Sequence, residues 1–522
     1  MSGGSYSIVG GDLKRAGTAS RALKERLKRI GVEPQTVRRA MISAFEAEMN
    51  VVIHAHQGTM RFSIDPRQID IEVSDKGPGI PDIALAMQEG YSTAPAYARE
   101  LGFGAGMGLP NIKKNSDHLN IQSVVGEGTR LYVTILLKAQ NDTIASKNSV
   151  HVAAEACREC LRCVRACPTR AIRVRRNTPE ILDHLCIDCG ACIEVCDTGA
   201  LRLDGKSDIP KPSEDALLVI HPSFFVQFGA AVRPRDVFKA LAHLGFYDVR
   251  LTDGWEHALR EAVLDYAKQH ERTRPVISPT CPAVVNLIEM RFPSLIPHLA
   301  PFLSPVEAVQ HELAGDSNVF VAACPAQRTA LLANQPPTPD EVVAPMSLRK
   351  AILRLETQEA LGADATPRHP CETHADSRGI LQVTGIPHVL RVLEHTENGL
   401  LRDVAVLHLC LCTQGCFGAP LSVEDPFVAQ HRWGLAYDDL KSSGKAVPRK
   451  SPFSPRAGMR LDPDMAKAIA KLAQIDDLTR RLPGKDCGLC GAPTCSAFAE
   501  DVALRRAPQT ACRCLGDQET KP

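Results

Sequence analysis

The run CRECLRCVRACP, residues 157–168, separates four cysteines by two, two and three residues and ends in a proline. A second run, CIDCGACIEVC at residues 186–196, repeats that spacing. Turns with two intervening residues let three thiolates face three corners of one iron–sulfur cube. A disulfide framework is typical of small secreted chains, and a zinc site needs only four ligands. The paired pattern of eight cysteines therefore favours two iron–sulfur clusters.

This doubled run resembles the bacterial dicluster ferredoxins, in which the fourth cysteine of each run binds the other cluster. The resemblance implies a ferredoxin module at about residues 150–206. Its first 4Fe–4S cluster would be held by Cys157, Cys160, Cys163 and Cys196. Its second would be held by Cys186, Cys189, Cys192 and Cys167.

The composition sets limits on the whole chain of 522 residues. Domains of about 100–200 residues predict three to five of them. A net charge of +1 provides no broad attraction to nucleic acid or to anionic lipid, so neither partner is expected. The first residues lack the basic and apolar regions of a signal peptide. No apolar stretch reaches the roughly 20 residues of a membrane helix. We therefore expect a cytoplasmic protein with oxygen-sensitive clusters, typical of an anaerobe.

Composition shifts divide the chain into four predicted domains. Polar residues 139–149 form a predicted linker, and three further domains follow the cysteine-free N-terminal one. Within the third domain, residues 335–366 combine prolines and charges and are expected to form a surface connection. A helix over about residues 462–482 is expected to lead into the last cysteine group. The predicted ranges are 1–138, 150–206, 214–445 and 460–522.

Four short motifs in the first 138 residues occur in an order that suits an ATP pocket. Glu46 and Asn50 are four residues apart in an apolar-periodic stretch, so they share one face of a helix. The later motifs are rich in glycine, and a glycine loop that enters a helix can wrap phosphates with its backbone N–H groups. Each motif alone is a weak signal, but all four in order are specific. The later three are DKGPG (75–79), GFGAGMG (102–108) and GEGT (126–129).

Together these motifs resemble the gyrase, histidine-kinase and heat-shock-chaperone (GHKL) ATPases, above all the anti-sigma-factor serine/threonine kinases. The resemblance implies a two-layer α/β sandwich. It implies that Glu46 orients or deprotonates the attacking group, that Asn50 holds Mg²⁺, and that Asp75 binds the adenine amino group with support from Thr129. The remaining positions would admit the nucleotide or form the phosphate lid: Gly77, Gly79, Gly102, Gly104, Gly106 and Gly108.

Cysteines in the third domain lie in the contexts PTCP, AACPAQ and LCTQGCFG. Scattered buried cysteines often act as small hydrophobes, but two of these precede proline after an apolar run. With their surroundings they resemble the catalytic domain of iron–iron hydrogenases, over about residues 215–425, which implies a two-lobed α/β fold. The implied ligands of a 4Fe–4S cluster are Cys281, Cys324, Cys412 and Cys416, the last of which would bridge to a diiron unit.

This domain departs from active hydrogenases at two informative positions. They carry a proton-transferring cysteine where this chain has Thr280, and a lysine that anchors a cyanide ligand where it has Gln327. Replacement of lysine by glutamine removes a full positive charge. Both changes argue against fast H₂ turnover. A sensing site, or a plain cubane without the diiron unit, is the more conservative interpretation.

The C-terminal segment DCGLCGAPTC, followed by further cysteines, resembles the small 4Fe–4S domain of Rnf-type electron-transport proteins and corrinoid iron–sulfur proteins. Zinc is the structural alternative, since four cysteines also suit it. Cys514 could replace Cys512 as the last ligand, and Cys371 and Cys410 are expected to be packing or surface thiols. The predicted ligands are Cys487, Cys490, Cys495 and Cys512.

Three hypotheses follow for the function. The first is a redox or H₂ sensor whose cluster state influences an ATP-dependent serine/threonine kinase-like domain. The second is an enzyme proper, an iron–iron hydrogenase or a ferredoxin-linked oxidoreductase with an accessory ATPase. The third is electron transfer energised by ATP hydrolysis. The expected partners are electron-transfer proteins such as ferredoxin and a regulatory protein that the kinase phosphorylates, and the expected ligands are ATP and Mg²⁺ besides the clusters.

Overall fold

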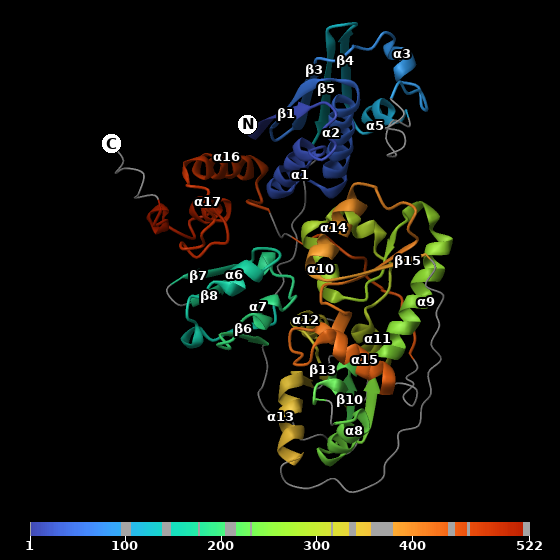
Figure 1. The fold of residues 1–522 in the computed structure, drawn as a ribbon, viewed down its shortest axis with the longest axis vertical. Helices are drawn as coiled ribbons and strands as arrows, with labels where there is room; N and C mark the ends of the chain where they lie inside the picture. The colour runs from blue at the N-terminus through green and yellow to red at the C-terminus, as the bar shows by residue number, and fades with distance from the viewer. Residues whose placement is uncertain are drawn as a thin grey trace. The chain divides into compact units, whose positions relative to one another are not determined.

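The structure is a computed structural model of the chain, which falls into two compact units. Unit 1 comprises residues 1–144, 457–490 and 494–522, and unit 2 comprises residues 145–456 and 491–493. The description covers residues 2–94, 106–137, 148–175, 178–203, 216–229, 232–314, 317–333, 341–356, 379–436, 444–456 and 460–514. Figure 1 shows the elements of each unit.

Unit 1 contains an antiparallel sheet of five strands in the order β1-β2-β3-β5-β4. Alternate side chains of its central strands are buried, for example Ile69, Ile71 and Val73, as expected for a sheet with one covered face. The alternating stretch IDIEVS (69–74) lies within β3. The strands are β1 (Ser2–Val9), β2 (Gln57–Ile64), β3 (Gln68–Asp75), β4 (His118–Val124) and β5 (Gly128–Leu136).

Helix α2 (Pro34–His54) packs on this sheet, and α1 (Thr18–Ile30) packs on α2. The N-terminus of α1 has no side-chain cap of its own, since Gly17 occupies the cap position. Instead the buried carboxylate of Glu48 on α2 accepts the backbone N–H groups of Ala19 and Ser20, at 3.1 and 3.0 Å. A carboxylate in that place contributes about 1 kcal/mol or more to helix stability. Short helices α3 (Ile83–Ala86) and α5 (Gly108–Lys114) complete the domain, a mixed α/β fold as predicted.

The C-terminal segment belongs to the same unit as this domain. Helix α16 (Met465–Arg481) packs on α1, and α17 (Cys495–Ala503) packs on α16. The predicted helix over 462–482 is thus present, three residues shorter at its start. Its buried side chains, among them Leu472 and Ile475, recur at helical spacing.

Unit 2 begins with two short antiparallel pairs of strands, which lie around the two cysteine runs in the sequence. Strand β6 (Val150–Val152) pairs with β9 (Leu201–Leu203), and β7 (Ile172–Arg175) pairs with β8 (Thr178–Ile181). Short helices α6 (Arg162–Ala166) and α7 (Ala191–Glu194) each begin within one cysteine run. Val164, Ile172 and Leu201 form the small core between them.

The rest of unit 2 has two parallel sheets flanked by helices, the predicted two-lobed α/β arrangement. One sheet has the order β11-β10-β13-β14 and the other β12-β16-β15. The strands are β10 (Leu217–Ile220), β11 (Asp248–Leu251), β12 (Val276–Ile277), β13 (Asn318–Val321), β14 (Glu341–Val343), β15 (Ile380–Thr384) and β16 (Val406–Cys410). The helices are α8 (Pro234–His243), α9 (Asp253–Gln269), α10 (Pro282–Arg291), α11 (Pro305–Glu312), α12 (Pro325–Ala333), α13 (Pro345–Glu356), α14 (Ile386–Glu397) and α15 (Pro426–Ala436).

The prediction of a surface connection over residues 335–366 is wrong in its middle part. That part contains an edge strand, β14, and a helix, α13, whose Leu348 and Ile352 are fully buried in the core of the first lobe. Their i, i+4 spacing is the signal of a helix, but the prolines before it and the charges around it conceal the pattern. Residues 334–340 and 357–378 lie outside the described part of the chain.

Candidate functional site

The helix face predicted to act on ATP lies on α2, beside the start of α5. The Asn111 side chain on α5 donates a hydrogen bond to Glu46 Oε1 at 2.7 Å. A Cβ added to Gly108 would lie 3.2 Å from Asn50 Oδ1 and 3.5 Å from Glu46 Oε2. The glycine at the first position of α5 thus lets its backbone approach both side chains. A phosphate there would meet a carboxylate, an amide and the backbone N–H groups of a helix start.

Asp75 lies at the end of β3 and organises the turns around it. Its Oδ1 accepts the backbone N–H groups of Gly77 at 2.8 Å and of Thr129 at 3.2 Å. The Thr129 hydroxyl lies 2.9 Å from the Ser123 hydroxyl. Burial raises the pKa of Asp75, although the two N–H groups work in the opposite direction. One carboxylate oxygen remains for a ligand, and an aspartate in such a place can accept an amino group.

The predicted glycines fall into two groups. Gly77, Gly79, Gly106 and Gly108 are described, while Gly102 and Gly104 lie outside the described residues. Gly79 has a φ of 73°, and a Cβ there would lie 2.3 Å from the backbone oxygen of Val124. No other residue fits at that position without moving the β4–β5 turn.

The ferredoxin-type cysteines of the two runs interact with one another. Burial, together with the charges of Cys160, Cys196 and Cys157, raises the pKa of the Cys163 thiol to about 11. Burial also raises the pKa of Cys192, to which the charges of Cys186, Cys167 and Cys163 contribute. Thiols of both runs therefore lie near one another, while the sorting of the eight cysteines into two cluster ligand sets stays a prediction.

The central cysteines follow the carboxyl ends of strands from both lobes. Cys281 follows β12, Cys324 follows β13, and Cys412 and Cys416 follow β16. In open α/β folds ligands bind at this edge of the sheets. Proline comes directly after Cys281 and Cys324 and begins α10 and α12, so both thiols lie at helix N-termini.

The central thiols are buried beside one another. Burial, together with the charge of Cys281, raises the pKa of Cys324 to about 12, despite hydrogen bonds from the backbone N–H groups of Gln327 and Ala326. A metal would favour the thiolate form, because thiol ligands bind metals without their protons. The donor set therefore fits an iron–sulfur cluster. Among the described residues, no three histidine, cysteine or carboxylate side chains converge closely enough for a single metal ion.

The central site also includes a thiol that the sequence prediction treated as packing. Cys410, the last residue of β16, interacts electrostatically with Cys281. It also contributes to the raised pKa of Cys412 and Cys416. The spacing C-x-C-x3-C of residues 410–416 was the signal that could have placed it here. The site thus holds one thiol more than a cubane requires.

Gln327 and Thr280, the two positions that depart from active hydrogenases, both form hydrogen bonds in this structure. Gln327 is buried, accepts the backbone N–H of Ala323 at 2.9 Å, and donates to Cys416 Sγ at 3.6 Å. The Thr280 hydroxyl lies 2.7 Å from the Ser278 hydroxyl and 3.5 Å from His408 Nδ1. Neutral hydrogen-bonding groups therefore occupy both places.

A carboxylate and two histidines also lie near the central cysteines, and no sequence motif predicts their presence there. The Oε1 atom of Glu256, on α9, lies 3.3 Å from His221 Nε2. Burial alone would raise the pKa of Glu256, but His221, His408 and Thr252 lower it overall. Burial lowers the pKa of His408. A cavity of about 20 Å³ lies beside His221 and Ala323, and this is room for about one water molecule.

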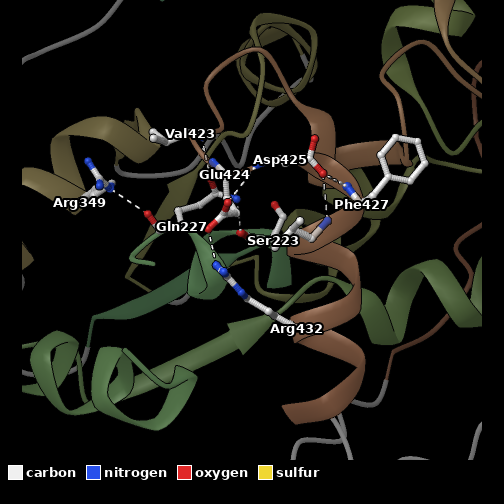
Figure 2. Close-up of polar contacts among 9 residues, drawn as sticks. Ser223, Gln227, Arg349, Val423, Glu424, Asp425, Phe427 and Arg432 are labelled. Carbon is white, nitrogen blue, oxygen red and sulfur yellow. Dashed lines mark hydrogen bonds and ion pairs between the residues drawn. The ribbon is translucent and has the colours of Figure 1, made fainter. Parts of the chain in front are cut away.

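The loop after the last central ligand is fastened by a buried glutamine (Figure 2). Gln227 Oε1 accepts the backbone N–H groups of Val423 and Glu424 at 2.7 and 2.9 Å, and its Nε2 donates to the Ser223 carbonyl at 2.9 Å. The backbone carbonyl of Gln227 accepts a hydrogen bond from Arg349 Nε at 3.1 Å. Figure 2 shows these groups around Gln227, and the two hydrogen bonds to its side-chain oxygen fix where the chain runs beyond Cys416.

The C-terminal cysteines lie around the start of α17. Thr494 caps this helix through Ala497 N–H at 3.1 Å, so Cys495 occupies its first position. A hydrogen bond between the Cys487 and Cys514 thiols raises the pKa of Cys514. Cys514 is therefore in contact with a predicted ligand, and the choice between Cys512 and Cys514 as the last ligand stays a prediction.

Four family models match separate parts of the chain. They are the histidine kinase-like ATPase domain at residues 10–135, the 4Fe–4S dicluster domain at 149–197, the C-terminal domain of the iron-only hydrogenase large subunit at 214–329, and a putative Fe–S cluster domain at 482–514. The predicted fusion of these four kinds of domain is confirmed. Their limits as predicted from the sequence stay predictions.

Curated relatives resemble the N-terminal domain. The serine/threonine-protein kinase RsbT of Bacillus subtilis is 33% identical over 102 residues, which are 18% of this chain and 71% of RsbT. The anti-sigma F factor of Caldanaerobacter subterraneus is 36% identical over 94 residues, 17% of this chain and 62% of that protein. Through this domain the chain belongs to the histidine kinase-like ATPase family that includes RsbT.

Solved structures offer a weaker comparison. The FeFe-hydrogenase HydA1 of Chlamydomonas reinhardtii aligns with 46% of this chain and 88% of its own, at 12% identity and a TM-score of 0.34. That score supports no conclusion, and the hydrogenase-type assignment rests on the family model. In the described part of the chain no helix is long and apolar enough to cross a membrane.

We predict that Gln227→Leu lowers the free energy of unfolding of unit 2 by about 2 kcal/mol, because the backbone N–H groups of Val423 and Glu424 lose their acceptor. Gln227→Glu should cost less, since a protonated carboxyl group keeps one donor and one acceptor. Both tryptophans, Trp255 and Trp433, lie in unit 2, so urea unfolding followed by tryptophan fluorescence reports on it selectively. Equal losses for the two variants would contradict this role of the amide.

Proposed function

We propose that this protein is a redox-responsive regulator in which the state of its iron–sulfur clusters controls an ATP-binding serine/threonine kinase-like domain. The observation that carries the proposal is the fusion, in one chain, of a domain related to RsbT with three iron–sulfur domains. The relatives of the N-terminal domain are a serine/threonine-protein kinase and anti-sigma factors. The substrate would accordingly be a regulatory protein with a phosphorylatable serine or threonine.

In this proposal Glu46 orients or deprotonates the group that attacks the phosphate. Asn50 binds Mg²⁺, and Asp75 binds the adenine amino group. The hydrogen bond from Asn111 to Glu46 and the approach of Gly108 to Asn50 support the first two roles. When bound, Mg-ATP supplies the phosphoryl group. The chain's own residues position it, with backbone N–H groups at the start of α5 available to the phosphates.

Four 4Fe–4S clusters are proposed, two in the ferredoxin module, one at the central site and one in the C-terminal domain. Within unit 2 the Cys189 thiol contributes to the raised pKa of Cys412, which supports electron exchange between the second ferredoxin cluster and the central one. Gly190, next to that thiol, packs against Pro325 and Pro420 of the central domain. Electrons would enter through a partner such as a ferredoxin.

A diiron unit at the central site is not part of this proposal. Gln327 offers an amide where a positive charge would anchor an anionic ligand, and Thr280 is no proton-transferring thiol. The alternative, a hydrogenase with an accessory ATPase, would need the diiron unit.

We predict that Asp75→Asn weakens ATP binding by about 10- to 100-fold, the loss of one hydrogen bond to a charged group. Burial raises the pKa of Asp75, so acidification protonates it at a higher pH than an exposed aspartate. Wild-type affinity should therefore fall as the pH decreases through that pKa, while the variant should show no such step. Calorimetric titration with Mg-ATP measures both, and Glu72→Gln on the same strand should change neither.

Glu46→Gln should separate binding from chemistry. ATP affinity should stay within about threefold of wild type, while ATP turnover should fall by about 100-fold or more, as when a general base is lost. Anaerobic measurement of phosphate release gives the turnover. Turnover unchanged by the substitution would remove Glu46 from its proposed role.

Redox control is tested on the full chain with all clusters in place. ATP affinity and turnover should differ by about 5- to 150-fold between oxidised protein and protein reduced with dithionite, the usual range of coupling between sites. Identical values in both states would refute the proposal. The iron content of the same sample, about sixteen atoms per chain for four cubanes, serves as the control.

Infrared spectra in the CO and CN stretching region decide between the two functions. Protein matured anaerobically with hydrogenase maturases should show no such bands. Bands that persist after gel filtration, together with H₂ evolution from reduced viologen, would favour the hydrogenase alternative.

A further inference from the structure

Helix α17 connects a predicted cluster ligand to the ATPase domain within unit 1. Cys495 is the first residue of the helix, and its backbone N–H donates to Asp486 Oδ1 at 2.7 Å. Five residues further along, Glu500 Oε2 lies 2.7 Å from Arg29 Nη2 at the end of α1. Both side chains of this ion pair are about one-fifth exposed, at 18% and 20%. A displacement of the ligand end of α17 would therefore act on α1 through a largely buried contact.

Further contacts hold the C-terminal segment on the same helix. Arg26 forms an ion pair with Asp476 on α16, and the backbone N–H of Leu461 donates to the Arg29 carbonyl at 3.0 Å. The Arg460 side chain covers Gly31, where an added Cβ would lie 2.6 Å from Arg460 Cγ. The C-terminal segment thus contacts α1 at Arg26 and Arg29 and at its C-terminal cap, Gly31.

The other end of α1 is fastened to the helix that carries the predicted ATP residues. Glu48 binds the first N–H groups of α1 and the Ser20 hydroxyl at 2.8 Å. On α2 it stands between Glu46 and Asn50, two residues from each. It is 2% exposed, so these hydrogen bonds are shielded from solvent in this structure. A movement of α1 along its axis is therefore transmitted to α2 at the predicted catalytic turn.

We infer that α1 is the element that couples the C-terminal iron–sulfur site to the ATP site, with the Glu500–Arg29 ion pair and the Glu48 cap as its two joints. This inference rests on the proposed function, whose redox control it assigns to one contact path. Glu48, Arg29 and Glu500 are positioning residues, because none of them belongs to the predicted ATP contacts or cluster ligands. The path uses only residues of unit 1, so it requires no particular arrangement of the two units.

The test is a charge exchange at the ion pair in the full cluster-loaded chain. Arg29→Glu and Glu500→Arg, each alone, should reduce the redox difference in ATP affinity to less than about twofold. The double variant Arg29→Glu with Glu500→Arg should restore at least half of the wild-type factor. Iron content and the electron paramagnetic resonance spectrum should be unchanged in all three. Arg480→Glu, at a 73% exposed side chain of α16, is the matched control and should keep the wild-type difference.

A second readout does not depend on redox control. Addition of Mg-ATP should slow hydrogen–deuterium exchange in α1 and α17 of the wild-type protein, and this protection of α17 should be lost in Arg29→Glu. If oxidised and reduced wild type bind ATP equally but α17 is protected, the proposed function fails and the path stands. If the single variants keep the redox difference, or ATP leaves α17 unchanged, the path is refuted.

Discussion

The burial of thiols that must lose their protons to bind a metal is the constraint on which the proposed central site depends. Strand ends from two lobes deliver Cys281, Cys324 and Cys412 to one place, and there burial, together with the charge of Cys281, raises the pKa of Cys324 to about 12. Helix N-termini at α10 and α12 lower the cost of negative charge but do not remove it. Iron would provide the missing positive charge, so the binding of a cluster at this predicted site would be thermodynamically linked to the folding of the region. The Gln227 hydrogen bonds fix the loop beyond Cys416.

Local sequence patterns were sufficient for much of the molecule. The doubled cysteine spacing marks the ferredoxin module, because three predicted ligands of each cluster lie within short turns of one another. The fourth ligand, from the other run, is implied by the resemblance to dicluster ferredoxins and stays a prediction. The i, i+4 relation of Glu46 and Asn50 puts both on one face of α2 whatever surrounds the helix. Glycine at positions such as Gly79 follows from a backbone conformation that other residues rarely adopt.

Long-range contacts could not be predicted in this way. Arg29 and Glu500 are 471 residues apart, and nothing near either residue marks the other as its partner. The meeting of Glu256, His221 and His408 depends likewise on how three separate elements pack. Helix α13 was missed for another reason, since its two buried side chains are too few to outweigh the prolines and charges beside them. Burial in the folded lobe, rather than local propensity, decides that such a segment is helical.

At the central site, Gln327 and Thr280 stand where active hydrogenases carry a lysine and a proton-transferring cysteine. Each of the two residues can replace only part of what the hydrogenase residue does. Gln327 cannot provide the charge that binds an anionic ligand, yet its amide still donates a hydrogen bond to the Cys416 sulfur. Hydrogen bonds to cluster sulfurs are among the factors that set reduction potential. Thr280 cannot relay protons as a thiol does, yet its hydroxyl keeps its place in a hydrogen-bonded row with Ser278 and His408. A cluster at this predicted site would thus have hydrogen-bonding groups that tune its potential, without the lysine and the cysteine that serve turnover. That combination would suit the proposed regulator, because its cluster would have to change state at a defined potential without consuming the electrons that report it.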